Sequence, residues 1–206
     1  MAPEHPVWID FARGMAPTMT PPAQALAGLL PLDATRPARI LDIAAGHGVF
    51  GIAAAQKYPL AQLVALDWAP VLEVARANAN AAGLEARFST IAGSAFKVDL
   101  GENYDVVLVP NFLHHFNPPT CVTFLKKVRS ALRPGGCVAI VEFVPNPDRV
   151  TPPEAASFSL VMLATTAAGD AYTFEEFDKM LSQAGFKPAQ QHPLPPSIAT
   201  AVIAAV

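Results

Sequence analysis

The feature that most restricts the fold is a glycine-rich turn between a short apolar run and a helix-like segment. Residues 41–51 read Leu-Asp-Ile-Ala-Ala-Gly-His-Gly-Val-Phe-Gly, so Gly46, Gly48 and Gly51 form the pattern G-x-G-x-x-G. Asp67 follows about twenty residues after the first glycine. Glycines let the backbone approach a ligand at a helix N-terminus, and an acid at this distance accepts hydrogen bonds from ribose hydroxyls. The pattern therefore predicts a strand-turn-helix unit that binds a nucleoside cofactor.

The rest of the chain alternates Val/Ile/Leu-rich runs with helix-like segments, which is typical of a parallel sheet covered on both faces. Two closing segments, 188–192 and 198–206, are close enough in sequence to pair as an antiparallel hairpin. The chain divides into a helical lead-in, residues 1–35, and a cofactor-binding domain, residues 36–206. Within the lead-in we expect two short helices, 5–15 and 22–30, separated by a proline pair. In the domain the expected strands are 39–43, 62–66, 86–91, 104–109 and 137–143, and the expected helices are 49–58, 70–82, 120–132, 154–166 and 174–184.

Composition excludes several classes of protein. The chain has 14 Lys and Arg against 17 Asp and Glu, a net charge of -3, which argues against nucleic acid as a partner. Cys121 and Cys137 lack metal-type spacing, and so few thiols indicate a reducing compartment. The sequence shows neither a signal-peptide pattern nor an apolar run long enough to span a membrane. We expect a cytoplasmic protein without a metal or a membrane partner.

Asp42, just before the glycine turn, bears on the type of cofactor. A carboxylate there would repel the pyrophosphate of NAD, whereas S-adenosylmethionine brings a cationic ammonium and sulfonium. The alternative is that Asp42 only caps amides of the loop and does not touch a ligand. The literal G-x-G-x-x-G pattern keeps a NAD-dependent oxidoreductase as a second hypothesis.

Further motifs follow in a fixed order along the chain. After residues 41–48 and Asp67 come Gly93-Ser94-Ala95-Phe96, Asn111-Phe112-Leu113-His114-His115-Phe116, Arg133-Pro134-Gly135-Gly136 and Glu142. In this order, residues 39–143 resemble the class I S-adenosylmethionine-dependent methyltransferases. The resemblance implies an α/β fold with a Rossmann-like seven-stranded sheet, mostly parallel, with a C-terminal antiparallel hairpin and helices on both faces.

Within that class the chain is most similar to the catalytic half of caffeate-type and bacterial natural-product O-methyltransferases. The likeness includes residues 8–12, 172–177 and 184–186. The helical dimerisation domain of those enzymes has no counterpart here, so a monomer and a homodimer both stay open. The resemblance implies methyl transfer to a small hydrophobic or aromatic acceptor, at oxygen.

The resemblance also implies a cofactor site. Gly46 and Gly48 would border the methionine moiety, Asp67 the ribose, and Ser94, Ala95 and Phe96 the adenine. Ser94 stands where the family has a carboxylate, and Trp68 would either flank the adenine or cover the sheet. The full set expected to bind S-adenosylmethionine is Asp42, Ala44, Gly46, Gly48, Asp67, Trp68, Ser94, Ala95, Phe96 and Asn111.

The expected catalytic residues are His114 and Glu142. A histidine is a suitable base for a hydroxyl nucleophile near neutral pH, and His114 follows the fourth strand, where such sheets bind ligands. By resemblance His114 is the catalytic histidine and Glu142 its supporting carboxylate, while a second supporting glutamate falls on Ala171. The alternatives are that His114 only lines the pocket and that the chain binds the cofactor without turnover. For His115 we favour a structural role.

Overall fold

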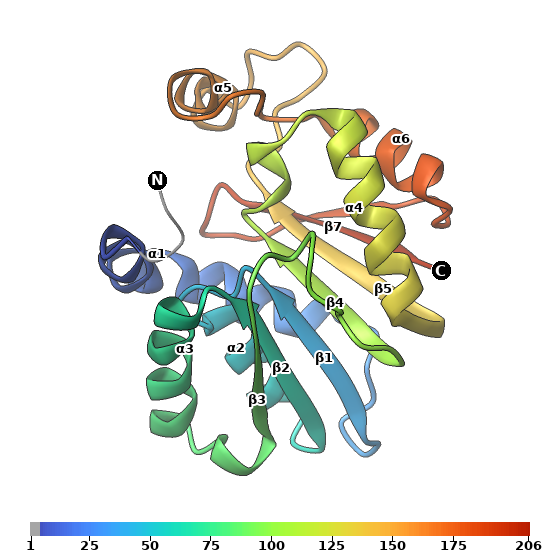
Figure 1. Cartoon of the computed structure of the whole chain (residues 1–206). Coiled ribbons are helices and arrows are strands. Elements are labelled where there is room, and N and C mark those ends of the chain that lie inside the picture. The colour runs from blue at the N-terminus through green and yellow to red at the C-terminus, as the bar shows by residue number, and fades with distance from the viewer. Residues whose placement is uncertain (1–4) are drawn as a thin grey trace.

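The computed structural model describes residues 5–206 and contains a seven-stranded sheet in the order β3-β2-β1-β4-β5-β7-β6 (Figure 1). Strands β1 to β5 are parallel, and β7 runs antiparallel to both β5 and β6. The predicted fold class is thus confirmed, including the C-terminal hairpin. The strands are β1 (Ala38–Ile43), β2 (Ala61–Asp67), β3 (Phe88–Ala92), β4 (Tyr104–Pro110), β5 (Leu132–Glu142), β6 (Gln190–Pro193) and β7 (Thr200–Ala205).

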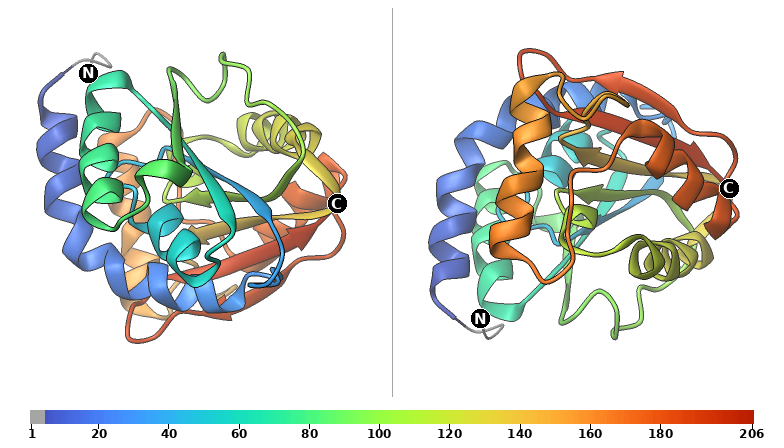
Figure 2. Two further views of the ribbon diagram at one scale, coloured as in Figure 1. Left: turned by 90° about the horizontal axis from the view of Figure 1, so that it is seen from below. Right: turned by 90° about the horizontal axis from the view of Figure 1, so that it is seen from above.

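Both faces of the sheet are buried because alternate residues of each central strand pack against helices on opposite sides. In β4, Val106 and Leu108 pack on one side, and Val107 and Val109 pack on the other. Helices α1 (Val7–Leu29), α2 (Val49–Lys57) and α3 (Ala69–Ala81) cover the first face; α4 (Pro118–Ala131) and α6 (Phe174–Ala184) cover the second (Figure 2). Helix α5 (Pro153–Thr165) lies beyond the carboxyl ends of the strands (Figure 1).

The N-terminal segment differs from the expectation of two short helices, because α1 is one helix of 23 residues. Pro17, Pro21 and Pro22 lie inside it, although an interior proline removes a backbone hydrogen bond at a cost of about 3 kcal/mol. A continuous buried stripe that includes Met19 and Leu26 packs against α2. Burial of this stripe outweighs the local cost of the prolines.

Within the parallel part of the sheet, two strands begin at least two residues away from the expected position. Residues Glu85–Arg87 form a 3₁₀ turn, closed by Arg87 N donating to Leu84 O, so β3 begins two residues later than predicted. Strand β5 begins at Leu132, which pairs with Tyr104 across an irregular register. The Arg-Pro-Gly-Gly segment therefore belongs to the strand and does not precede it.

The order of the strands reverses between β1 and β4, which are neighbours although β2 and β3 lie between them in sequence. At such a point the connections leave the two strands in opposite directions and open a crevice at their carboxyl ends. The loops after β1 and β4 meet there.

No helix within residues 5–206 has both the length and the apolar character needed to cross a membrane.

Candidate active site

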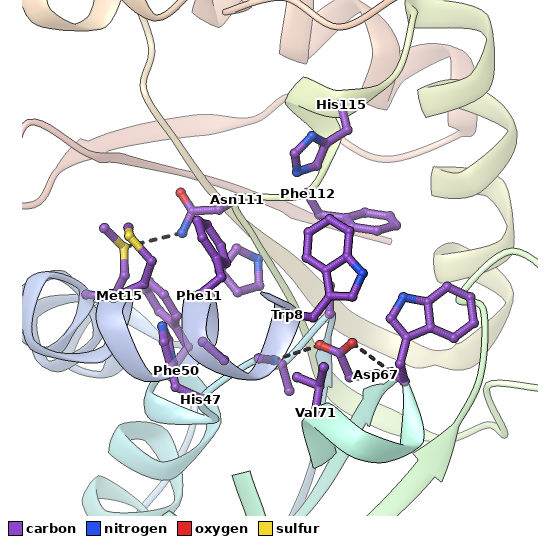
Figure 3. Close-up of a pocket in the computed structure, with 17 residues that line it drawn as sticks. Trp8, Phe11, Met15, His47, Phe50, Asp67, Val71, Asn111, Phe112 and His115 are labelled. Carbon is purple, nitrogen blue, oxygen red and sulfur yellow. Dashed lines mark hydrogen bonds between the residues drawn. The ribbon is translucent and has the colours of Figure 1, made fainter. Parts of the chain in front are cut away.

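A cavity opens in this crevice, and four segments of the chain supply its walls (Figure 3). Asp67 and His115 project into it from opposite sides, and aromatic side chains of α1 lie between them (Figure 3). The lining residues are Trp8, Phe11, Ala12, Met15 and Met19 of α1; Ala44, Ala45, Gly46, His47 and Phe50 after β1; Asp67, Trp68 and Val71 after β2; and Pro110, Asn111, Phe112 and His115 after β4. Five of the residues expected to bind cofactor are among them, namely Ala44, Gly46, Asp67, Trp68 and Asn111.

The loop after β1 turns through left-handed backbone conformations. The φ angles are 51° at Ala44, 56° at Gly46 and 77° at Gly48. Gly46 N donates to Asp67 Oδ2 at 2.8 Å, and Trp68 N donates to Oδ1 at 2.7 Å. Burial raises the pKa of Asp67, and these two backbone donors oppose the rise. The carboxylate is thereby fixed at the end of β2, beside the loop.

Asp42 lies beneath the loop and is not one of the lining residues. Its Oδ2 accepts a hydrogen bond from Gly51 N at 2.9 Å, which ties the end of β1 to the first turn of α2. Oδ1 is buried and has no partner among the described residues. Burial first, and the charge of Asp67 to a lesser extent, raise the pKa of Asp42 to about 7. Asp42 thus accepts from a backbone amide near the loop, a role of the kind that the sequence left open as an alternative to ligand binding.

Four other residues expected to bind cofactor lie outside the cavity lining. Gly48 is the N-cap of α2, and a Cβ there would lie 3.1 Å from Ala75 Cβ. Ser94 accepts two backbone hydrogen bonds through its carbonyl in the turn after β3, and Ala95 is buried. Phe96 packs among other aromatic rings, those of Phe112, Phe116 and Phe124.

The two expected catalytic residues form a buried pair. His114 Nδ1 lies 2.5 Å from Glu142 Oε2, and both side chains are almost fully buried. Glu142 Oε1 accepts from three consecutive backbone amides, Phe112 N at 3.1 Å, Leu113 N at 3.0 Å and His114 N at 3.3 Å. In the tautomer with the proton on Nδ1, His114 donates to Glu142 and keeps a lone pair on Nε2.

The neighbouring histidine has the opposite placement. His115 lines the cavity and His114 does not, and the two rings lie 4.2 Å apart between centroids. Burial, with a smaller contribution from His114, lowers the pKa of His115 to about 4. His115 is therefore a neutral ring facing the cavity. His114 is stacked edge-on against Phe158 of α5, at 5.0 Å between centroids.

The loop after β4 is also held from the side of α6. Asp170 N donates to His114 O at 3.0 Å, and Tyr172 Oη donates to Phe116 O at 2.5 Å. Gly169 lies so close to His114 O that a Cβ at this position would overlap it. The backbone that carries both histidines is thus fixed by partners distant in sequence.

Comparison with known proteins agrees with this geometry. The family profile of the O-methyltransferase domain matches residues 10–187. The chain belongs to this family. It is 31% identical over 176 residues to the 3-hydroxy-5-methyl-1-naphthoate 3-O-methyltransferase of Streptomyces sahachiroi, covering 85% of this chain and 50% of that protein. The chain spans 38–50% of the length of the first curated relatives that it matches.

Two crystal structures show the same fold. A candidate O-methyltransferase from Nostoc punctiforme PCC 73102 is 52% identical, with a TM-score of 0.95 over 100% of this chain and 62% of that one. Human N-acetylserotonin methyltransferase in complex with SAM is 23% identical, with a TM-score of 0.84 over 96% of this chain and 55% of that one. At that identity the human protein supports the fold alone.

Sequence reasoning missed part of this O-methyltransferase cavity. Trp8, Phe11 and Met15 line it, and their spacing of three and four residues along one helix face was the available signal. His47, which the sequence did not single out, is buried and also lines the cavity. The apolar residues 158–163 of α5 do not line the cavity: Met162 is buried and Phe158 partly buried, while Leu160, Val161 and Leu163 are exposed.

Proposed function

We propose that this chain carries out S-adenosylmethionine-dependent methyl transfer to a hydroxyl oxygen of a small aromatic acceptor. The observation that carries the proposal is the buried pair of His114 and Glu142; His114 belongs to the loop after β4, which lines the cavity through its neighbour His115. Membership of the O-methyltransferase family supports the reaction class. The family match does not support the second hypothesis, a NAD-dependent oxidoreductase.

The residues of the cavity fit an S-adenosyl cofactor. Gly46 faces the cavity, and a side chain there would have no neighbour but Ala44 O at 3.8 Å, so the missing Cβ leaves room for a ligand. Each oxygen of Asp67 accepts one backbone hydrogen bond and retains a lone pair for a ribose hydroxyl. Trp68 and Ala44 supply apolar walls. When bound, the cofactor supplies an electrophilic methyl group on a cationic sulfonium.

His114 is the base that we propose. An acceptor hydroxyl would transfer its proton to Nε2, and the imidazolium so formed would be stabilised by Glu142 through Nδ1. Three backbone donors on Oε1 of Glu142 hold the carboxylate in place beside the ring. Phe158 against the imidazole excludes water from one side of it.

The apolar lining favours an aromatic acceptor. The name of the Streptomyces relative specifies a hydroxynaphthoate, which has an aromatic ring. We further propose that residues 1–35 complete the site of the domain 36–206, because α1 forms one wall of the cavity. A cytoplasmic homodimer is the state we propose; both cysteines are free and buried, as expected in a reducing compartment.

The first test separates the cofactors. S-adenosylhomocysteine should raise the melting temperature and give a binding isotherm, whereas NAD should do neither. Stabilisation by NAD alone would overturn the proposal. Turnover is then measured with a panel of phenols, and binding without turnover on any of them would favour the non-catalytic alternative.

The second test concerns the base. His114→Ala should slow methyl transfer by about 10²- to 10⁴-fold and leave the affinity for S-adenosylhomocysteine nearly unchanged. The defect should shrink at a pH above the pKa of the phenol, because an ionised acceptor needs no base. His115→Ala is the control, and we expect it to change the KM of the acceptor more than kcat. A wild-type rate for His114→Ala at neutral pH would contradict the role of His114 as a base. Catalysis would then rest on the alignment of acceptor and cofactor alone.

A further inference from the structure

Within residues 5–206, no cationic side chain lines the cavity. Among the described residues that line it, none is lysine or arginine, and Asp67 is its one acidic residue. An S-adenosyl amino acid nevertheless carries a carboxylate at the end remote from its adenine. A buried carboxylate needs hydrogen-bond donors in place of the water that it loses.

His47 has the geometry of such a donor. Its Nδ1 accepts a hydrogen bond from Val49 N at 3.1 Å, so Nδ1 carries no proton. In the neutral ring the proton is then on Nε2, which makes this atom a donor. Burial lowers the pKa of His47 to about 4, so the ring is neutral at physiological pH.

The position of this donor is fixed. Asn78 Nδ2 donates to His47 O at 2.8 Å, which anchors the backbone of the loop to α3. The ring lies with Phe50 beneath α1, to one side of Asp67 (Figure 3). Nε2 forms no hydrogen bond to the described part of the chain, and it is not a buried atom. Because His47 lines the cavity, Nε2 is open to the cavity.

Other polar groups of the lining are less suited to this role. Asn111 Nδ2 is directed at Met19 Sδ, 3.4 Å away. His115 belongs to the loop with His114, on the side of the cavity where transfer takes place. Trp68 follows Asp67 and lies at the ribose end. His47, by contrast, lies on the glycine turn itself, next to Gly46.

We propose that Nε2–H of His47 donates a hydrogen bond to the carboxylate at the amino-acid end of the cofactor. This inference rests on the proposed function and makes His47 a specificity residue. It selects adenosyl thioethers that carry an amino acid over those that do not.

The test compares two ligands and two variants by titration calorimetry. S-adenosylhomocysteine has the amino-acid end, and 5′-methylthioadenosine lacks it. In His47→Asn the side-chain oxygen can still accept from the amide two residues on, as Asp33 and Asp99 do elsewhere in this chain, while the distal donor is lost. His47→Gln keeps an N–H group at about the reach of Nε2.

His47→Asn should lower the affinity for S-adenosylhomocysteine by about ten- to a hundredfold, the usual range for a hydrogen bond to a charged group. The affinity for 5′-methylthioadenosine should stay within about twofold of the wild-type value. His47→Gln should recover most of the loss. Equal losses for both ligands, or none for either, would overturn the role of His47. Failure of the wild-type protein to bind either ligand would instead refute the proposed function.

Discussion

The loops after β1 and β4 face one another across the cavity, but they are built in different ways. The loop after β1 is shaped mainly by its own backbone, with left-handed residues at positions 44, 46 and 48 and nearby acids accepting its amides. The loop after β4 is shaped by side chains and amides from β5 and the α5–α6 connection, through Glu142, Asp170 and Tyr172. The first loop should therefore determine affinity for the cofactor, and the second should determine rate.

The largest predicted effect is that of Gly46→Val, which tests whether the loop after β1 determines affinity for the cofactor. A β-branched residue at φ 56° is strained, and its side chain would project into the cavity. We expect S-adenosylhomocysteine affinity to fall by at least about 100-fold in calorimetry, with the fold retained by circular dichroism. Gly83→Val is the matched control, since Gly83 also has positive φ (72°) and open space but lies far from the loop. The control should lose stability and keep its affinity.

A second prediction concerns the acid beneath the first loop. The pKa of Asp42 is about 7 in the folded protein and near 3.8 when unfolded, so the folded state holds the proton more tightly. The stability that this group contributes is complete below about pH 4 and is lost as pH rises through 7. The Asn side chain of Asp42→Asn cannot titrate. On going from pH 5 to pH 8, the free energy of unfolding of this variant should therefore rise by on the order of 2 kcal/mol relative to that of the wild type. Denaturant unfolding at both pH values measures this, and parallel stability curves would contradict it.

The smallest predicted effect tests the second loop. Tyr172→Phe removes the hydrogen bond to Phe116 O and should lower kcat several-fold, about 1 kcal/mol, with cofactor affinity unchanged. Tyr58→Phe is the matched control, because its buried hydroxyl donates to Ala27 O and Leu30 O, away from the site. Both variants should lose similar stability in denaturant titrations. An equal fall in kcat for both variants would contradict a role of Tyr172 in positioning the loop after β4.

The same contrast explains what could be read from the sequence. Gly46 and Asp67 are separated by a fixed, short stretch of one strand-helix-strand unit, so their meeting was predictable. The parallel sheet was predictable from the alternation of apolar runs and helices, whereas the seven-stranded sheet was implied by the resemblance to class I methyltransferases. By contrast, Gly169 and Tyr172 contact the loop after β4 from more than fifty residues away, and no local pattern marks them.

Helix α1 differs from the prediction of two short helices because its tertiary packing outweighs the local effect of its prolines. Its prolines argue for a break, yet burial of one long face, seen only after folding, keeps the helix whole. The same helix brings Trp8 and Phe11 to the cavity. His114 and His115 show a further limit: adjacent residues in a 3₁₀ turn point in different directions, and sequence alone does not show which one faces the cavity.

Helix α5 also has a consequence for the behaviour of the protein in solution. Leu160 and Leu163 are 67% and 77% exposed on a helix whose one charged residue is Glu154. The whole chain carries a net charge of only -3, with a pI of about 5.9. Near that pH, repulsion between molecules vanishes while the exposed leucines still attract one another. Colloidal stability should therefore be lowest around pH 6 and improve in mildly alkaline, low-salt buffer.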